Sequence, residues 1–136
     1  MAGGFAIAGV RHDSGETSLE VFAPNGAGTN KVASFMLPRG LVPKVMLADP
    51  KRCENASEKC LTYVGFELEG ANRDNGRAVV GIVEHERGNP ASAHLIPSFV
   101  QTASPELSLL EIDTERDVLY AVASAANRVT PIQLAR

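Results

Sequence analysis

The fold of this chain is decided by the stretch DVLYAVAS, residues 117–124. It is a short apolar run with an aromatic residue near its start. An acidic turn at 113–116 precedes it, and the polar pair at 127–128 closes it. A run of this length between turn residues is typical of a β-strand.

Similar runs occur twice upstream, at 60–66 and at 4–10. When Ile7, Tyr63 and Tyr120 are aligned, the spacings between them are 56 and 57 residues. A nearly constant period of this kind indicates a repeat architecture.

Short apolar and alternating runs, separated by turn residues, continue along the whole chain and predict antiparallel strands. The Asn75-Gly76 pair is the strongest hairpin signal, because both residue types tolerate positive φ. In the middle of the chain we expect a short helical turn at 91–93 and an outer strand at 94–100 that contains Pro97. The prediction is a single all-β domain, residues 1–136, with three, four and three strands in units at 4–37, 44–100 and 107–134.

The units share an order of features: an apolar strand, an acidic turn, a strand with Tyr and small residues, a turn and a further strand. Residues 109–134 show this order most clearly. It resembles a blade of a β-propeller, and is most similar to the loosely conserved blades of lactonase-like and quinoprotein-like propellers. The resemblance covers nearly the whole chain and implies about two and a half blades. The chain has no Trp-Asp dipeptide and no kelch Gly-Gly signature.

Two and a half blades cannot close a ring, so the resemblance implies blade faces that are left open to water. Copies of the chain would then associate, or a partner chain would supply further blades, or the chain would be part of a larger propeller. The alternative fold is a single β-sandwich or small barrel of eight to ten strands, in which the repeat is a coincidence. A mixed α+β fold is the third alternative.

Composition excludes several classes of function. The chain has 136 residues, 44% of them hydrophobic and 21% charged, which is typical of a globular domain. A formal net charge of −3 and the absence of Trp give no bulk attraction or stacking platform for nucleic acid. No apolar stretch is long enough to span a membrane, and the first residues do not have the pattern of a signal peptide. We therefore expect a soluble, cytoplasmic protein.

Cys53 and Cys60 are separated by six residues, whereas zinc-binding cysteine pairs usually have two to four between them. No second Cys or His pair lies nearby in the sequence, so we expect no metal site. Free thiols are the first expectation for a cytosolic protein. A disulfide between the two is the alternative, and it would indicate a secreted protein.

The chain has no nucleophile elbow, no zinc-protease motif, no P-loop and no dinucleotide fingerprint. We therefore expect a non-enzymatic protein-interaction or ligand-binding module that needs no cofactor. The alternative is a lactonase-like hydrolase, in which His12, Asp49 and Asp113 are the only candidates to hold a divalent metal. Asp49 and Asp113 occupy equivalent repeat positions, where we expect each to cap a tight turn.

Binding functions concentrate on loops, and the loops between the second and third strands of a blade lie on one rim of a propeller. All three such loops carry Arg, which suits carboxylate and phosphate groups. The hypothesis is an Arg-bearing rim that recognises an acidic peptide or anion, in a protein that binds a protein partner or forms a homo-oligomer. Ordinary solvated turns are the alternative. The candidate residues are Arg11, His12, Arg73, Arg77, Asn127 and Arg128.

Overall fold

A computed structural model describes residues 5–53, 59–69 and 76–134. These residues form an all-β fold of eleven strands in three antiparallel sheets. The sheets are open and do not close into a barrel within the described ranges, so the barrel alternative does not hold there. No helix in the same ranges is long and apolar enough to cross a membrane.

The first sheet contains β1 (Ala6–Arg11), β2 (Thr17–Asn25) and β3 (Gly28–Met36), in the order β1-β2-β3. Each strand turns back beside the previous one. Gly15 and Gly26 have φ angles of 88° and 60°, which side chains with a Cβ rarely adopt. Glycine at these positions lets the two hairpins close tightly.

The middle sheet contains β4 (Leu41–Ala48), β5 (Lys59–Leu68), β6 (Val79–Glu86) and β7 (Asn89–Leu95). These four strands are neighbours in chain order, and the two-residue strand β8 (Val100–Gln101) pairs with β6. This sheet is the largest of the three.

The third sheet contains β9 (Leu109–Asp113), β10 (Val118–Ala123) and β11 (Arg128–Gln133), with β10 in the centre. A single 3₁₀ turn, η3 (Ser124–Ala126), joins β10 to β11. Asn127 follows this turn with a φ of 55°, in the left-handed region that Asn tolerates better than most residues.

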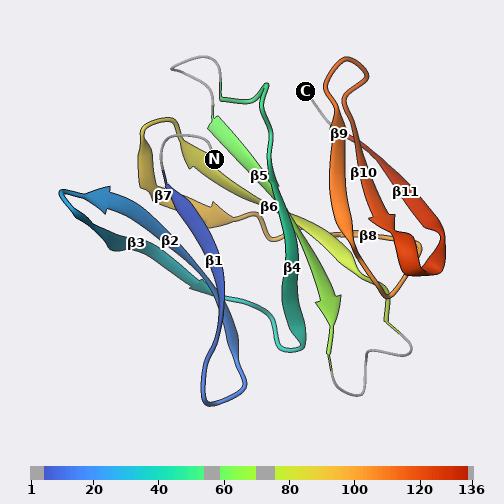
Figure 1. The fold of residues 1–136 in the computed structure, drawn as a ribbon, viewed down its shortest axis with the longest axis horizontal. Coiled ribbons are helices and arrows are strands. Elements are labelled where there is room, and N and C mark those ends of the chain that lie inside the picture. The colour runs from blue at the N-terminus through green and yellow to red at the C-terminus, as the bar shows by residue number, and fades with distance from the viewer. Residues whose placement is uncertain (1–4, 54–58, 70–75, 135–136) are drawn as a thin grey trace.

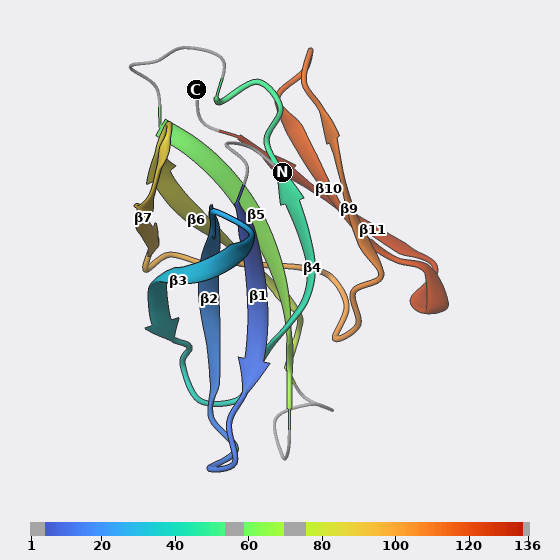
Figure 2. The same cartoon turned by 60° about the vertical axis from the view of Figure 1, so that its left-hand side comes forward.

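The three sheets follow one another across the molecule in chain order, as Figures 1 and 2 show. Two hydrophobic cores separate them. Leu19 of β2 lies in the core against the middle sheet, together with Val64 and Phe66 of β5. Tyr63 of β5 points the other way, into the core that it shares with Leu119 of β10. The middle sheet is therefore covered on both faces, whereas the first and third sheets are each covered on one.

The sequence predicts three, four and three strands, whereas the described sheets have three, five and three and cover 6–36, 41–101 and 109–133. The additional strand is β8, which pairs with β6. The outer strand expected at 94–100 is present as β7, but it covers Asn89–Leu95, and the helical turn expected at 91–93 is wrong because these residues belong to that strand. Strand β7 begins at Asn89, directly after a tight turn at Gly88, whose φ is 75°. Pro90 is tolerated because β7 pairs with only one neighbouring strand.

Candidate interaction surface

Strand β10 has apolar side chains on both of its faces, although it lies in an outer sheet. Leu119 and Ala121 are buried in the core beneath the third sheet. Because side chains alternate along a strand, Val118, Tyr120 and Val122 point to the opposite face. These three are partly buried although no further sheet covers them among the described residues.

The strand register extends this face across the whole third sheet. Val122 lies between Leu109 of β9 and Val129 of β11. The exposed fractions of Leu109 and Val129 are 39% and 56%. In the next row Tyr120 lies between Glu111 and Pro131. We call this surface the outer face of the third sheet; it consists of Leu109, Glu111, Asp113, Val118, Tyr120, Val122, Val129, Pro131 and Gln133.

The residues aligned in the sequence, Ile7, Tyr63 and Tyr120, lie in β1, β5 and β10 and point in the same direction along the molecule. Strand β1 is at the edge of its sheet, whereas β5 and β10 are inner strands. Ile7 of β1 packs in the core between the first and middle sheets. Tyr63 of β5 packs in the core between the middle and third sheets. Tyr120 of β10 points away from that second core, onto the outer face. Ile7 and Tyr63 therefore each face the sheet that follows their own, whereas Tyr120 faces outward, where no sheet of the described residues covers it.

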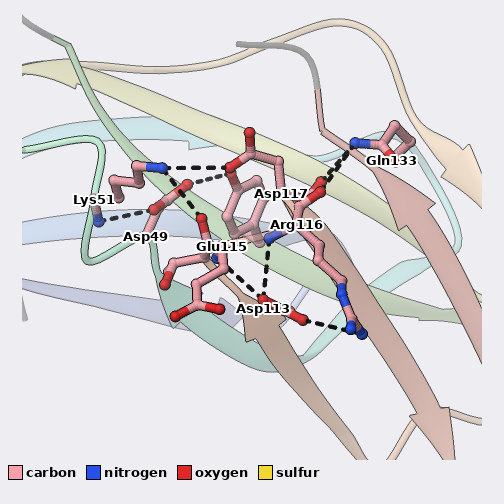
Figure 3. Close-up of polar contacts among 9 residues, drawn as sticks. Asp49, Lys51, Asp113, Glu115, Arg116, Asp117 and Gln133 are labelled. Carbon is pink, nitrogen blue, oxygen red and sulfur yellow. Dashed lines mark hydrogen bonds and ion pairs between the residues drawn. The ribbon is translucent and has the colours of Figure 1, made fainter.

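A polar cluster joins the third sheet to the middle one at one end of the molecule (Figure 3). Asp49 is 1% exposed, and its Oδ1 accepts a hydrogen bond from the backbone N–H of Lys51 at 3.0 Å. The Lys51 ammonium donates to the carbonyl of Thr114 at 3.2 Å and lies 3.8 Å from Asp117 Oδ1. These contacts hold the β9–β10 turn against the end of β4.

The acidic turn itself is fixed by Asp113, whose Oδ1 accepts hydrogen bonds from the backbone N–H groups of Glu115 and Arg116 at 3.0 and 3.1 Å. Figure 3 also shows Gln133 of β11 donating to the carbonyls of Arg116 and Asp117. The expectation that Asp49 and Asp113 cap turns is confirmed. These hydrogen bonds fix the β9–β10 turn to β11 and to the end of β4.

The first sheet has a corresponding outer face on the other side of the molecule. Leu19 and Val21 of β2 point into the first core, so Phe22 points outward. Its row contains Ala6 and Lys31, and the row beside it contains Ala8 opposite Glu20. Lys31 and Glu20 form an ion pair at 3.7 Å. This face therefore combines small and apolar side chains with one pair of charges.

No family model, curated protein or solved structure matches the chain.

The Arg-bearing loops follow β1, β5 and β10, which run in the same direction in Figure 1. Arg11 is not a free cation, because its guanidinium donates to both carboxylate oxygens of Glu69, one of them at 2.8 Å. This hydrogen bond and the attraction of opposite charges raise the pKa of Arg11. The same hydrogen bond with Arg11 lowers the pKa of Glu69. An anion would have to compete with Glu69 for this side chain.

The other residues proposed for the Arg-bearing rim do not form one cluster with Arg11 in the described part of the chain. His12 Nε2 lies 2.9 Å from the hydroxyl of Ser18. Arg77, Asn127 and Arg128 are exposed. No hydrogen bond or ion pair between described residues joins the candidates to one another, and Arg73 lies outside the described residues. A cleft of about 550 Å³ lies beside Glu69 and is lined by Gly15, Thr17, Arg39, Gly40 and Leu41 among others.

The first expectation for the cysteines is wrong, because Cys53 and Cys60 form a disulfide. This finding fits the secreted alternative. The two cysteines lie beside the side chain of His85, which is 2% exposed. Burial lowers the pKa of His85 and favours its neutral form.

The sequence-based search for sites considered loops and therefore missed the outer face of the third sheet. The signal was present in Val118-Leu119-Tyr120-Ala121-Val122, where apolar side chains do not alternate with polar ones. A strand of this kind is normally covered on both faces. His85 was missed because its proximity to Cys60 depends on the pairing of β5 with β6.

Proposed function

We propose that this protein is a non-enzymatic interaction module that uses the outer face of its third sheet to bind another β-sheet, and that a second copy of the chain supplies this sheet. The proposal rests above all on one observation. Val122 lies between the exposed residues Leu109 and Val129, and Tyr120, which the sequence aligns with the buried Tyr63, lies on the same face in the next row. Burying such a face is favourable by about 25 cal/mol for each Å² of apolar surface.

The three sheets follow one another across the molecule, and Ile7 and Tyr63 each face the sheet that follows their own. We infer that association continues this order. The outer face of the third sheet in one copy then packs against the outer face of the first sheet in the next copy. Glu111 on the former and Lys31 on the latter carry opposite charges, and Lys31 also forms an ion pair with Glu20 of its own sheet. A head-to-tail contact of this type is heterologous, so it generates a closed ring or a filament.

The hydrolase alternative has no observation in its favour. His12 forms a hydrogen bond with Ser18 of the first sheet. Asp49 and Asp113 accept hydrogen bonds from backbone N–H groups in the turns that follow β4 and β9. A hydrolytic metal needs ligands that converge on one point. These three do not form a ligand group within the described part of the chain.

A complementation experiment tests the proposal. Val129→Arg introduces a charge into the outer face of the third sheet, and Ala8→Arg introduces one into the outer face of the first. Each variant alone should be monomeric. An equimolar mixture should form a one-to-one dimer, because the Ala8→Arg copy keeps an intact third sheet and the Val129→Arg copy keeps an intact first sheet.

Val100→Arg is the matched control, because Val100 is 45% exposed but belongs to the middle sheet. It should associate like the wild type. If the wild type associates and the mixture stays monomeric, the head-to-tail arrangement is wrong. If the wild type never associates, the proposal that a second copy of the chain binds this face is wrong, and a different protein must cover it.

A further inference from the structure

A group of three donor side chains lies away from the outer faces; Cys60 and His85 are buried and Cys53 is partly exposed. Cys53, Cys60 and His85 each offer one ligand atom, and these atoms lie within 4.8 Å of one another. Cys60 and His85 are directly opposite each other in the pairing of β5 with β6. Their backbone positions are therefore set by the sheet and do not depend on a loop.

The imidazole of His85 is the unusual member of this group. It is 2% exposed, and neither ring nitrogen has a hydrogen-bond partner among the described residues. Buried polar groups in proteins nearly always have such a partner. Phe5 packs edge-on against the ring, with 4.5 Å between the ring centroids, which restricts its orientation. The result is a fixed, buried imidazole with two unused nitrogens beside two sulfur atoms.

We propose that reduction of the Cys53–Cys60 disulfide converts this group into a binding site for one Zn²⁺ ion, held by the two thiolates and the imidazole of His85. Two cysteines and one histidine are a ligand set that zinc accepts, with the fourth position left for water or an external ligand. Two thiolates balance the charge of the ion, so the buried site carries no net charge. This neutrality avoids the large cost of burying an unpaired charge.

The chemistry balances in two steps. A thiol or phosphine reductant supplies two electrons, the S–S bond breaks, and two protons from solvent complete two thiols. Zn²⁺ then binds both sulfurs and releases those two protons to solvent. In tetrahedral coordination the two sulfurs lie about 3.8 Å apart, a separation that follows from Zn–S bonds of about 2.3 Å. The disulfide and the zinc site therefore exclude each other, and the redox state of the surroundings selects between them.

The test uses the full chain, reduced with a phosphine in the absence of oxygen. Co²⁺ is added first, because its visible absorption reports tetrahedral geometry and its near-ultraviolet absorption reports bonds to thiolate. Zn²⁺ is then added to displace it, in competition with a chromophoric chelator. We expect one ion per reduced chain. X-ray absorption of the zinc form should show two sulfur neighbours and at least one imidazole nitrogen.

The oxidised chain should bind Zn²⁺ at least about 100-fold more weakly, as should the reduced variants Cys60→Ser and His85→Leu. His94→Leu is the matched control, because His94 is an exposed histidine of the same sheet, and it should bind like the wild type. The proposal is overturned if the reduced wild-type protein with Co²⁺ shows no thiolate-to-cobalt band in the near ultraviolet. It is also overturned if X-ray absorption of the zinc form shows no imidazole nitrogen bound to the metal. It is equally overturned if His85→Leu, shown to be folded by circular dichroism, binds as tightly as the wild type.

Discussion

The hydroxyl of Tyr63 donates a hydrogen bond of 2.6 Å to Asp49 Oδ2, and both side chains are almost completely buried. The same carboxylate accepts from the backbone of Lys51, whose ammonium in turn contacts the third sheet. One buried carboxylate thus links the middle sheet to the turn that positions its neighbour.

Tyr63→Phe should destabilise the protein by about 1.5–3 kcal/mol, because it removes a donor to a buried charged group. Tyr120→Phe is the control, because Tyr120 is the other tyrosine of the chain and its side chain points to the outer face. That variant should remain within about 0.5 kcal/mol of the wild type. Urea unfolding followed by circular dichroism measures both. Equal losses for the two variants would contradict the different surroundings assigned to these tyrosines.

Gly65→Ala should also destabilise the fold. A Cβ at this position would overlap the side chain of Leu107, which packs from the connection to the third sheet, and would approach Val45 at 2.8 Å. Overpacking of this kind costs about 1–3 kcal/mol. Gly28→Ala is the control, because nothing lies within 4 Å of its added Cβ and its φ is not positive. If Gly65→Ala is neutral under the same unfolding assay, the close approach of the two sheets is not as described.

Reduction of the disulfide in the absence of metal should lower the free energy of unfolding by up to about 2.5 kcal/mol, the loop-closure value for a ring of this size. Cys53→Ser should lose a similar amount, and its stability should no longer respond to reductant. The comparison of wild type and variant, each with and without phosphine, checks this. A wild type that unfolds at the same urea concentration in both conditions would show that the bond does not constrain the unfolded chain.

The Arg11–Glu69 ion pair predicts a specific pH dependence. Glu69 has a pKa below its ordinary value of 4.5 in the folded protein, because Arg11 hydrogen-bonds to it. A carboxyl group of this kind stabilises the fold fully above its unfolded pKa, and the contribution is lost as the pH falls through the folded pKa. Both side chains are nearly half exposed, so the effect is small.

Glu69→Gln should therefore be less stable than the wild type at pH 7, and the difference should shrink below pH 4.5. The urea midpoints of the two proteins at several pH values give this difference directly. Glu115→Gln is the control, because the Glu115 contact with Asp113 involves only its backbone. A Glu69→Gln difference that grows at low pH would contradict the predicted sign.

The division into three groups of antiparallel strands could be predicted from the sequence because its signals are local. Apolar runs mark the strands, and glycines such as Gly15 and Gly26 mark the turns. Strand β7 could not be placed, because Gly88-Asn89-Pro90 looks like an interruption until the tight turn at Gly88 is seen. Its first residues then pair directly with Glu86.

The candidate sites depended on information that no local pattern contains. Arg11 was expected to be available for an anion, but its partner Glu69 directly follows β5 of another sheet, 58 residues away. The cysteine pair gave no metal signal, because His85 becomes its neighbour only through strand pairing. The outer face of the third sheet could not be predicted, because the sequence does not show which side of β10 is covered by the middle sheet.

The central claim is that the outer face of the third sheet binds a second copy of the chain. The most direct measurement is the solution mass by light scattering over a wide range of concentration, for the wild type and for Val129→Arg. The account predicts a wild-type mass that rises above the 14.4 kDa of one chain, and a variant that stays at that value. A wild type that remains at 14.4 kDa at every concentration, or a variant that associates equally well, would contradict it.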